Sequence, residues 1–232
     1  MNNTLSRTIK QLGVVAAVIL GIVVLNSFLP AQHNPLRPID LDDPIGVATN
    51  FKLARIKTDT ELCYTLLDKA GVAYTRLGSD AGTDRCPLPN AMVLDRSRLP
   101  YSVAPLRMTC AAVAALYIWE HDVLIPAAES HFGSPVEEVL TYGSFSCRNI
   151  AGTDRLSEHG RANAIDVRGF RLADGREINV RQHWREASDR GKFLQEVFEG
   201  GCDVYSVGLG PDYNAAHADH FHFDMGGSSI CR

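Results

Sequence analysis

The stretch that decides this fold is Ser157-Glu158-His159-Gly160-Arg161-Ala162-Asn163-Ala164-Ile165-Asp166-Val167. A second stretch, His217-Ala218-Asp219-His220-Phe221-His222-Phe223-Asp224, follows it towards the C-terminus. The second half of each stretch alternates apolar and polar residues, and residues two apart on a β-strand point to the same face. We therefore expect two strands. Their apolar face would carry Ile165, Val167, Phe221 and Phe223, and their polar face Asp166, His220, His222 and Asp224.

These two stretches hold enough nitrogen and carboxylate ligands for one zinc ion. Four of the chain's eight histidines lie in them. A catalytic zinc site uses three protein ligands and leaves a fourth position for water, so two His and one Asp would suffice. Zinc lowers the pKa of bound water to roughly 7 and polarises a carbonyl group. A further histidine beside the ion could carry protons to a leaving amine, and His220 is the candidate.

Other polar residues carry weaker signals. Arg148 precedes the first stretch, and its guanidinium could bind a substrate carboxylate or simply lie on the surface. Glu158 could act as a general base or be an ordinary solvated carboxylate. The loop Gly208–Asn214 abuts the second stretch and is expected to form a wall of the cleft. The remaining histidines have no such neighbours and are expected on the surface or in packing: His33, His121, His131 and His183.

Residues 1–30 are predicted to form a cytoplasmic tip and a transmembrane anchor. Positions 12–29 are apolar apart from two polar residues, and a helix of that length spans about 27 Å, enough for a bilayer core. Arg7 and Lys10 precede it, which predicts a cytoplasmic N-terminus and an exported domain. A cleaved signal peptide is the alternative, although Leu29-Pro30-Ala31 matches a cleavage site poorly.

The rest of the chain is predicted to be a tether and one domain. Residues 31–54 are rich in proline and aspartate and are expected to be extended. Residues 55–232 have the length of one ordinary domain. The net charge of −4 is mild, and no basic cluster is interleaved with aromatic residues. We therefore do not expect nucleic acid as a partner.

Six cysteines, all beyond the apolar segment, predict disulfides in an exported domain. They are Cys63, Cys86, Cys110, Cys147, Cys202 and Cys231. None has the C-x-x-C spacing of a zinc knuckle or a redox centre, and sequence alone does not choose among the pairings. Our working prediction joins nearest neighbours: Cys63–Cys86, Cys110–Cys147 and Cys202–Cys231.

The order of helices and strands predicts an α+β domain, with a small antiparallel sheet and flanking helices. Helices are expected over residues 58–70, 108–132 and 184–198. Strands are expected over residues 139–142, 163–172, 177–180, 204–207 and 219–224. Ala173-Asp174-Gly175 is the predicted hairpin turn after the second of these strands.

Four segments of the chain resemble the bacterial extensin-like C-terminal domain family. They are Gly143–Asn149, Leu156–Val167, Gly169–Arg176, and Leu209–Asn214 leading to His222-Phe223-Asp224. The resemblance covers about residues 55 to 232. The Ser-x-His-x6-Asp and His-x-His patterns are also similar to the lysostaphin/D-Ala-D-Ala carboxypeptidase group of zinc peptidases. The pattern looks closest to that of the penicillin-insensitive murein endopeptidases.

The peptidase resemblance implies a zinc D-Ala-D-Ala peptidase-like fold and a role for each site residue. The implied zinc ligands are His159, Asp166 and His222. His220 would be the catalytic histidine beside the metal. Arg148 would orient the substrate, which makes it a catalytic as well as a substrate-binding candidate. Ser157 and His217 are the other residues expected to bind substrate. The carboxypeptidases place a Glu upstream of the last ligand, where this chain has Asp219 and His220, so the resemblance names no general base.

The sequence as a whole predicts a single-pass zinc peptidase anchored in a bacterial inner membrane, with its domain in the periplasm. Its partners would be that membrane and peptidoglycan stem peptides, cut as an endopeptidase or carboxypeptidase at or near D-Ala. One alternative is a non-catalytic murein-binding or wall-organising protein on the same fold. Another is a zinc N-acetylmuramoyl-L-alanine amidase, which would cut the sugar–peptide lactyl bond.

Overall fold

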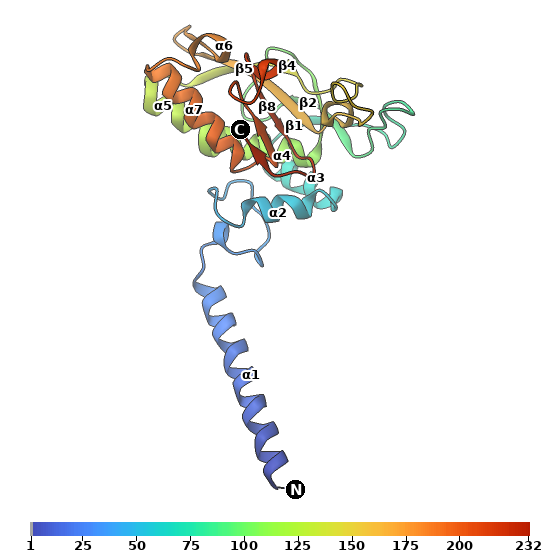
Figure 1. Cartoon of the computed structure of the whole chain (residues 1–232), viewed down its shortest axis with the longest axis vertical. Coiled ribbons are helices and arrows are strands. Elements are labelled where there is room, and N and C mark those ends of the chain that lie inside the picture. The colour runs from blue at the N-terminus through green and yellow to red at the C-terminus, as the bar shows by residue number, and fades with distance from the viewer. Residues whose placement is uncertain (1) are drawn as a thin grey trace.

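The computed structural model describes residues 2–232. A long helix, α1 (Asn2–Phe28), projects from a body that the rest of the chain forms (Figure 1). Lys10–Phe28 has a mean hydropathy of 2.2 and is not buried, so α1 is a candidate membrane span. Cys110–Phe132 passes the same test of length and composition but is 72% buried, as a core helix is.

The body is built around a six-stranded sheet. Its strands run in the order β4 (Val136–Gly143), β5 (Ala164–Leu172), β8 (Phe221–Asp224), β7 (Val207–Leu209) and β9 (Ile230–Cys231), with β6 (Glu177–Asn179) paired to β5. Neighbours are antiparallel except β7 and β9, which are parallel. The strands predicted from sequence are present here, although β7 begins at the end of its predicted range and β8 begins after His220.

A second sheet has three antiparallel strands, β1 (Ala73–Arg76), β2 (Ala91–Arg96) and β3 (Leu106–Thr109). We predicted none of these strands, and we had assigned the end of β3 to the following helix. The mixed α+β class is confirmed, but the single small sheet was wrong. Runs of about four apolar residues, such as Ala91–Leu94, do not distinguish a strand from a buried helix by periodicity.

Helix α4 (Cys110–Trp119) is buried along its whole length; it packs on β2 and β3, and its last residue, Trp119, reaches the six-stranded sheet. The indole N–H of Trp119 donates to the carbonyl of Val197 at 2.9 Å. The Trp119 ring lies 6.1 Å from the ring of Phe170 on β5 and 5.7 Å from that of Phe223 on β8. The helical path continues through a π-helical turn, η2 (Glu120–Leu124), into α5 (Ile125–Phe132), so the predicted long helix is confirmed from its third residue.

Two helices follow β6. They are α6 (Val180–His183) and α7 (Asp189–Cys202), and residues 184–188 between them are not helical. The predicted helix over 184–198 was therefore wrong in its first part, because Ser188 caps α7 by accepting a hydrogen bond from the N–H of Gly191. A Cβ at Gly201 would lie 2.4 Å from the ring of Phe223, so glycine allows α7 to approach β8 closely.

Residues 31–56 form a folded collar between α1 and the body. It contains a short 3-10 turn, η1 (Ala31–His33), and helix α2 (Thr49–Ile56), and it packs near α3 (Thr60–Lys69). Leu41 is only 1% exposed. The Asp42 carboxylate pairs with Arg98 at 2.8 Å. The predicted extended tether was wrong. Burial of apolar side chains such as Leu41 stabilises a folded segment and outweighs the tendency of the prolines to keep the chain extended.

Three disulfides join Cys63 to Cys110, Cys86 to Cys147 and Cys202 to Cys231. No cysteine of the described chain is free. The third predicted pair is confirmed and the other two were wrong. Helix α3 lies against α4, which brings the Cα atoms of Cys63 and Cys110 within 6.1 Å. Packing between distant elements, and not closeness in sequence, thus decides the pairing.

The pairing yields a first prediction. Peptide mapping of the non-reduced protein should recover the Cys63–Cys110 and Cys86–Cys147 cross-links, and thiol alkylation without reductant should label no cysteine. Replacing both Cys63 and Cys110 by alanine should destabilise the domain by about 2–5 kcal/mol, because a closed loop then opens in the unfolded chain. A Cys63–Cys86 cross-linked peptide would contradict the structure.

A buried carboxylate lies where the π-helical turn begins. Glu120 accepts hydrogen bonds from the hydroxyl of Ser97, from the hydroxyl of Tyr101 at 2.6 Å and from the N–H of Arg98 at 3.0 Å. Burial raises the pKa of Glu120 to about 7, and the hydrogen bonds from Ser97 and Tyr101 oppose that rise. The folded state therefore binds this proton more tightly than the unfolded chain does.

This raised pKa yields a second prediction. A carboxyl group whose pKa is higher in the folded state contributes stability below its unfolded pKa, and that stability is lost as the pH rises from about 4.5 to about 7. Chemical denaturation should show this loss, of about 3 kcal/mol. Glu120→Gln should flatten the slope over the same window, and an unchanged slope would refute the assignment.

Candidate functional site

The site begins with the register of two strands. In the antiparallel pair of β5 and β8, Asp166 lies opposite His222, and Ala164 lies opposite Asp224. Side chains directly opposite each other project from the same face with Cβ atoms roughly 4.5–5.5 Å apart. The alternating residues Ile165, Val167, Phe221 and Phe223 are fully buried on the core face. The alternation predicted for these strands is therefore confirmed.

A short 3-10 turn brings the third residue to this face. Ser157 caps the turn η3 (Glu158–Arg161), its hydroxyl accepting a hydrogen bond from the N–H of His159 at 3.3 Å. Ala162 ends the turn in the left-handed region, with φ of 55°. A non-glycine residue there costs roughly 1–2 kcal/mol. This sharp turn leads directly into β5 and holds His159 above Asp166.

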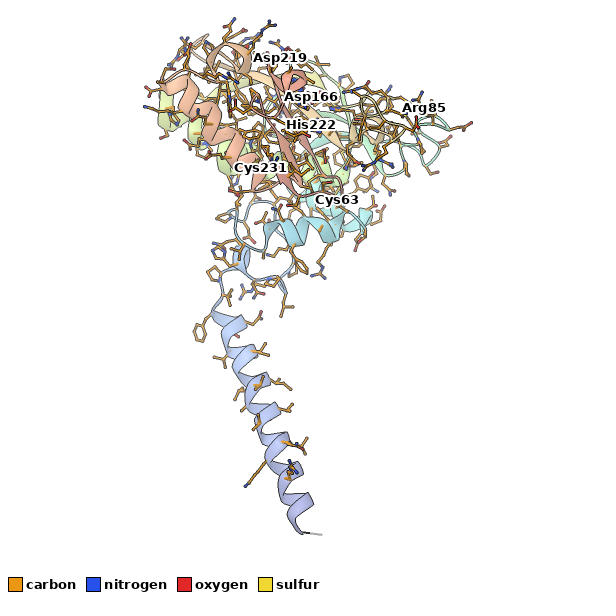
Figure 2. All side chains as sticks on the ribbon, in the orientation of Figure 1. Cys63, Arg85, Asp166, Asp219, His222 and Cys231 are labelled. Carbon is orange, nitrogen blue, oxygen red and sulfur yellow. A yellow bond between two sulfur atoms is a disulfide. The ribbon has the colours of Figure 1, made fainter. Side chains whose placement is uncertain are left out.

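His159, Asp166 and His222 form a nearly equilateral triangle of ligand atoms. Nε2 of His159 lies 3.0 Å from Nδ1 of His222 and 3.1 Å from Oδ1 of Asp166. Nδ1 of His222 lies 3.0 Å from the same Oδ1. Figure 2 shows Asp166 and His222 close together in the body, well away from α1. In residues 2–232 this is the one group of three such side chains with metal-binding geometry.

The triangle fits a tetrahedral zinc ion. Zinc bonds of about 2.1 Å at tetrahedral angles separate ligand atoms by roughly 3.4 Å, close to the spacings found here. In each histidine, the ring nitrogen that is not a vertex of the triangle also has a polar partner. Nδ1 of His159 donates to the carbonyl of Ser144 at 2.9 Å, and Nε2 of His222 lies 2.9 Å from Oδ2 of Asp224. Such partners fix the tautomer of a metal-binding imidazole, so the donor set suits a divalent cation.

The electrostatics of the triangle also favour a cation. Burial tends to lower the pKa of His222, but hydrogen bonds with Asp166 and Asp224 raise it to about 9. Burial tends to raise the pKa of Asp166, but hydrogen bonds from His159 and His222 hold it well below its usual range. One positive charge is thus stabilised between two carboxylates. A metal ion binding there would take the place of that proton.

His220 lies beside the triangle and has its own carboxylate partner. Its Nδ1 is 2.9 Å from Oδ1 of Asp219, and its Nε2 is 3.6 Å from Oδ1 of Asp166. The hydroxyl of Tyr142 donates to Oδ2 of Asp219 at 3.2 Å, and the Tyr142 ring meets the His220 ring edge-on at 5.7 Å. His220 is therefore oriented, with Nε2 turned towards the triangle but not among its three vertices.

The loop Gly208–Asn214 positions His217 at the same face. Asn214 caps the turn η4 (Ala215–His217), and its side-chain oxygen lies 2.9 Å from Nδ1 of His217. The ring of His217 is 5.3 Å from that of His220 and 5.9 Å from that of His222. Burial, together with repulsion from these two rings, lowers the pKa of His217 to about 4. It is thus neutral at pH 7 and able to contact a ligand.

The other predicted site residues lie less centrally. Arg148 is exposed, its backbone carbonyl accepts from the N–H of Ser157, and its guanidinium has no ion pair within residues 2–232. Ser157 is buried as a helix cap. Glu158 accepts from the side chain of Asn163 at 2.7 Å instead of facing the triangle. The other histidines have partners elsewhere: Val47 for His33, Asp122 for His121, Glu196 for His131 and Asn179 for His183.

Four residues at the site were missed as functional candidates. Asp224 was placed on the correct face, and its position two residues after His222 was a signal that it could orient that ring. Asp219 directly precedes His220, and that adjacency was a signal that it could orient the His220 ring. The roles of Ser144 and Tyr142 had no signal in the sequence, because their contacts depend on how distant segments pack. Ser144 and Tyr142 also line a hollow of about 300 Å³, together with residues of the 103–107 segment.

A family model described as extensin-like protein C-terminus matches residues 61–232. The chain belongs to this family. The match includes all strands and every site residue of this extensin-like domain, and it confirms the family resemblance found in the sequence. A comparison with curated proteins and a comparison with solved structures each gave no match.

The triangle yields a third prediction. The full chain, purified in detergent, should bind one zinc ion, and His222→Ala should abolish stoichiometric binding. Asp224→Ala should weaken zinc affinity by about 10–100-fold, because the ring of His222 loses its orienting carboxylate. Chelator competition measures both effects, and His131→Ala, remote from the triangle, is the matched control. Stoichiometric zinc in a His159→Ala/His222→Ala double variant would disprove the ligand set.

Proposed function

We propose that this extensin-like domain is a zinc-dependent hydrolase of amide bonds in peptidoglycan stem peptides, at or near D-Ala. The triangle of His159, Asp166 and His222 is the observation that carries the proposal. The resemblance of these motifs to zinc peptidases supports it. A bound zinc ion would supply an acidified water and an electrophile for the scissile carbonyl.

The proton-transfer group in this proposal is His220. Its Nδ1–H donates to Asp219, which leaves the lone pair of Nε2 facing the triangle. Nε2 can therefore accept a proton on that side and return it to the leaving amine. Tyr142 restrains Asp219 through its hydroxyl, so the two residues together hold the imidazole in this orientation.

Two arginines would orient a substrate that carries a carboxylate. Arg148 has an exposed guanidinium, and Arg168 lies two residues beyond Asp166 on the same face of β5. The Arg168 guanidinium is 5.9 Å from the centre of the Tyr142 ring. Neither arginine pairs with a carboxylate within residues 2–232, so both can bind one from a ligand. A stem peptide offers such a group close to its D-Ala amide bonds.

The proposed location is the periplasmic side of a bacterial inner membrane, with α1 as a single-pass anchor and the N-terminus in the cytoplasm. The apolar, unburied surface of α1 supports an anchor, and a signal sequence is the alternative. Three disulfides suit an oxidising compartment. Figure 2 shows Asp219 on the side of the body remote from α1, so the site would face the cell wall.

The fourth prediction separates catalysis from metal binding. His220→Ala should keep near-stoichiometric zinc yet lose about 10²–10⁴-fold in turnover on purified murein, the range for a missing general acid–base group. Asp219→Asn should lose part of that activity, because it weakens the hold on His220. Arg148→Ala should mainly raise KM, because it acts on substrate binding. Zinc loss in His220→Ala as complete as in His222→Ala would make His220 a ligand.

Product analysis by mass spectrometry distinguishes the alternative functions. Cleavage within the stem peptide supports the peptidase, and release of intact stem peptides from the sugar indicates the amidase. A zinc-loaded chain that binds murein but releases nothing from it would instead establish a non-catalytic wall-binding protein.

A further inference from the structure

The collar (residues 31–56) exposes large apolar side chains close to the end of α1. Val47 is 85% exposed, Leu36 is 71% exposed and Phe51 is 55% exposed. Beyond α1, the first two are the most exposed large apolar residues in the described part of the chain. Single apolar residues on a surface need no explanation, but a group of them in one segment marks an interaction site.

Hydrogen bonds place two of these residues beside the end of α1. The side-chain amide of Asn34 donates to the backbone and side-chain oxygens of Asn26 in α1, at 3.1 and 2.6 Å. The side-chain oxygen of Asn34 accepts from the N–H of Leu36 at 2.9 Å. The N–H of Val47 lies 3.3 Å from Nδ1 of His33, which follows α1 closely in the chain. The collar is therefore joined to α1 by specific contacts.

Helix α2 adds an exposed phenylalanine to the same segment. Leu53 and Ile56 are buried in the core of the body, whereas Lys52 is buried within the collar, where its ammonium donates to the carbonyl of Ala31 at 2.7 Å. Phe51 and Arg55 are exposed. Figure 1 shows α2 lying across the molecule between the body and α1. Phe51 and Arg55 are thus exposed on the element that lies between the body and α1.

The charges of the collar are divided in the same way. Asp40 pairs with Lys69 at 2.6 Å and Asp42 pairs with Arg98 at 2.8 Å, so both carboxylates are engaged with the body. Arg37 and Arg55 are exposed, and within residues 2–232 neither pairs with a carboxylate. Apolar side chains flanked by arginines are typical of a surface that lies in the interface of an anionic bilayer.

We propose that the outer face of the collar rests in the headgroup layer of the membrane that α1 spans. This outer face comprises Leu36, Arg37, Val47, Phe51 and Arg55. The proposal depends on the proposed anchor. The bilayer is the expected occupant because the collar begins within three residues of Phe28, the last residue of α1. This contact would hold the catalytic face at a set height and turn it away from the membrane.

Tryptophan fluorescence in the full chain tests this contact. Phe51→Trp and Val47→Trp would be reconstituted in phosphatidylethanolamine/phosphatidylglycerol vesicles, with and without brominated acyl chains. Tyr213→Trp is the control, because Tyr213 is exposed and packs on His217 at the site. Emission from the native Trp119 and Trp184 is subtracted using the unsubstituted chain. Near-ultraviolet circular dichroism verifies folding, and two probe positions guard against the failure of one.

We expect the emission maximum of both collar probes to shift to shorter wavelength in vesicles. We also expect both probes to lose most of their emission in brominated vesicles, and Tyr213→Trp to show neither effect. Quenching no greater than that of Tyr213→Trp, in a chain that resists extraction at high pH, overturns the contact and leaves the anchor intact. A wavelength shift that depends on the protein-to-lipid ratio, without quenching by brominated lipid, would show that a second copy of the chain covers the collar. That result would also overturn the contact with the bilayer. Extraction of the chain at high pH refutes the anchor, and the collar proposal with it.

Discussion

The antiparallel register of β5 and β8 is the constraint on which the site depends. It sets Asp166 opposite His222 on one face and Val167 opposite Phe221 on the other. A slip of one residue would turn every one of these side chains to the opposite face. Burying a phenylalanine stabilises the fold by about 1.5–3 kcal/mol, whereas a typical hydrogen bond contributes about 0.5–1.5 kcal/mol. The core therefore selects the register, and the apposition of Asp166 and His222 follows from it.

Two helices, α4 and α7, pack on the core face of β8 and hold that register. Trp119 of α4 packs on Phe223, and Gly201 allows α7 to close over the same ring. On the polar face, the triangle places two imidazoles and a carboxylate in a nearly buried position. Such a cluster is costly to desolvate, and a bound cation would offset that cost through three ligand bonds. This balance is the physical reason for linking the triangle to zinc chemistry.

The collar and the disulfides relate this site to its surroundings. Cys86–Cys147 ties the second sheet to the segment that carries Arg148, and Cys63–Cys110 joins α3 to the start of α4. The collar packs on the body through Leu41 and the Asp42–Arg98 pair, so the body is not joined to α1 by a flexible linker. Under the proposed function, such a hold would confine the domain to murein close to the membrane.

The sequence by itself determined the features that short spacings encode. These are the apolar α1 and the alternation of β5 and β8, because each depends on residues a few positions apart. The grouping of His159 and Asp166 with His222, which lies 56 positions beyond Asp166, was implied by a family resemblance and not by local spacing. Only the tertiary structure decided the disulfide pairing, the three-stranded sheet, the folded collar and the hold of Ser144 on His159. These contacts join residues from separate elements, which only the packed structure brings together. No local pattern records which distant surfaces will meet.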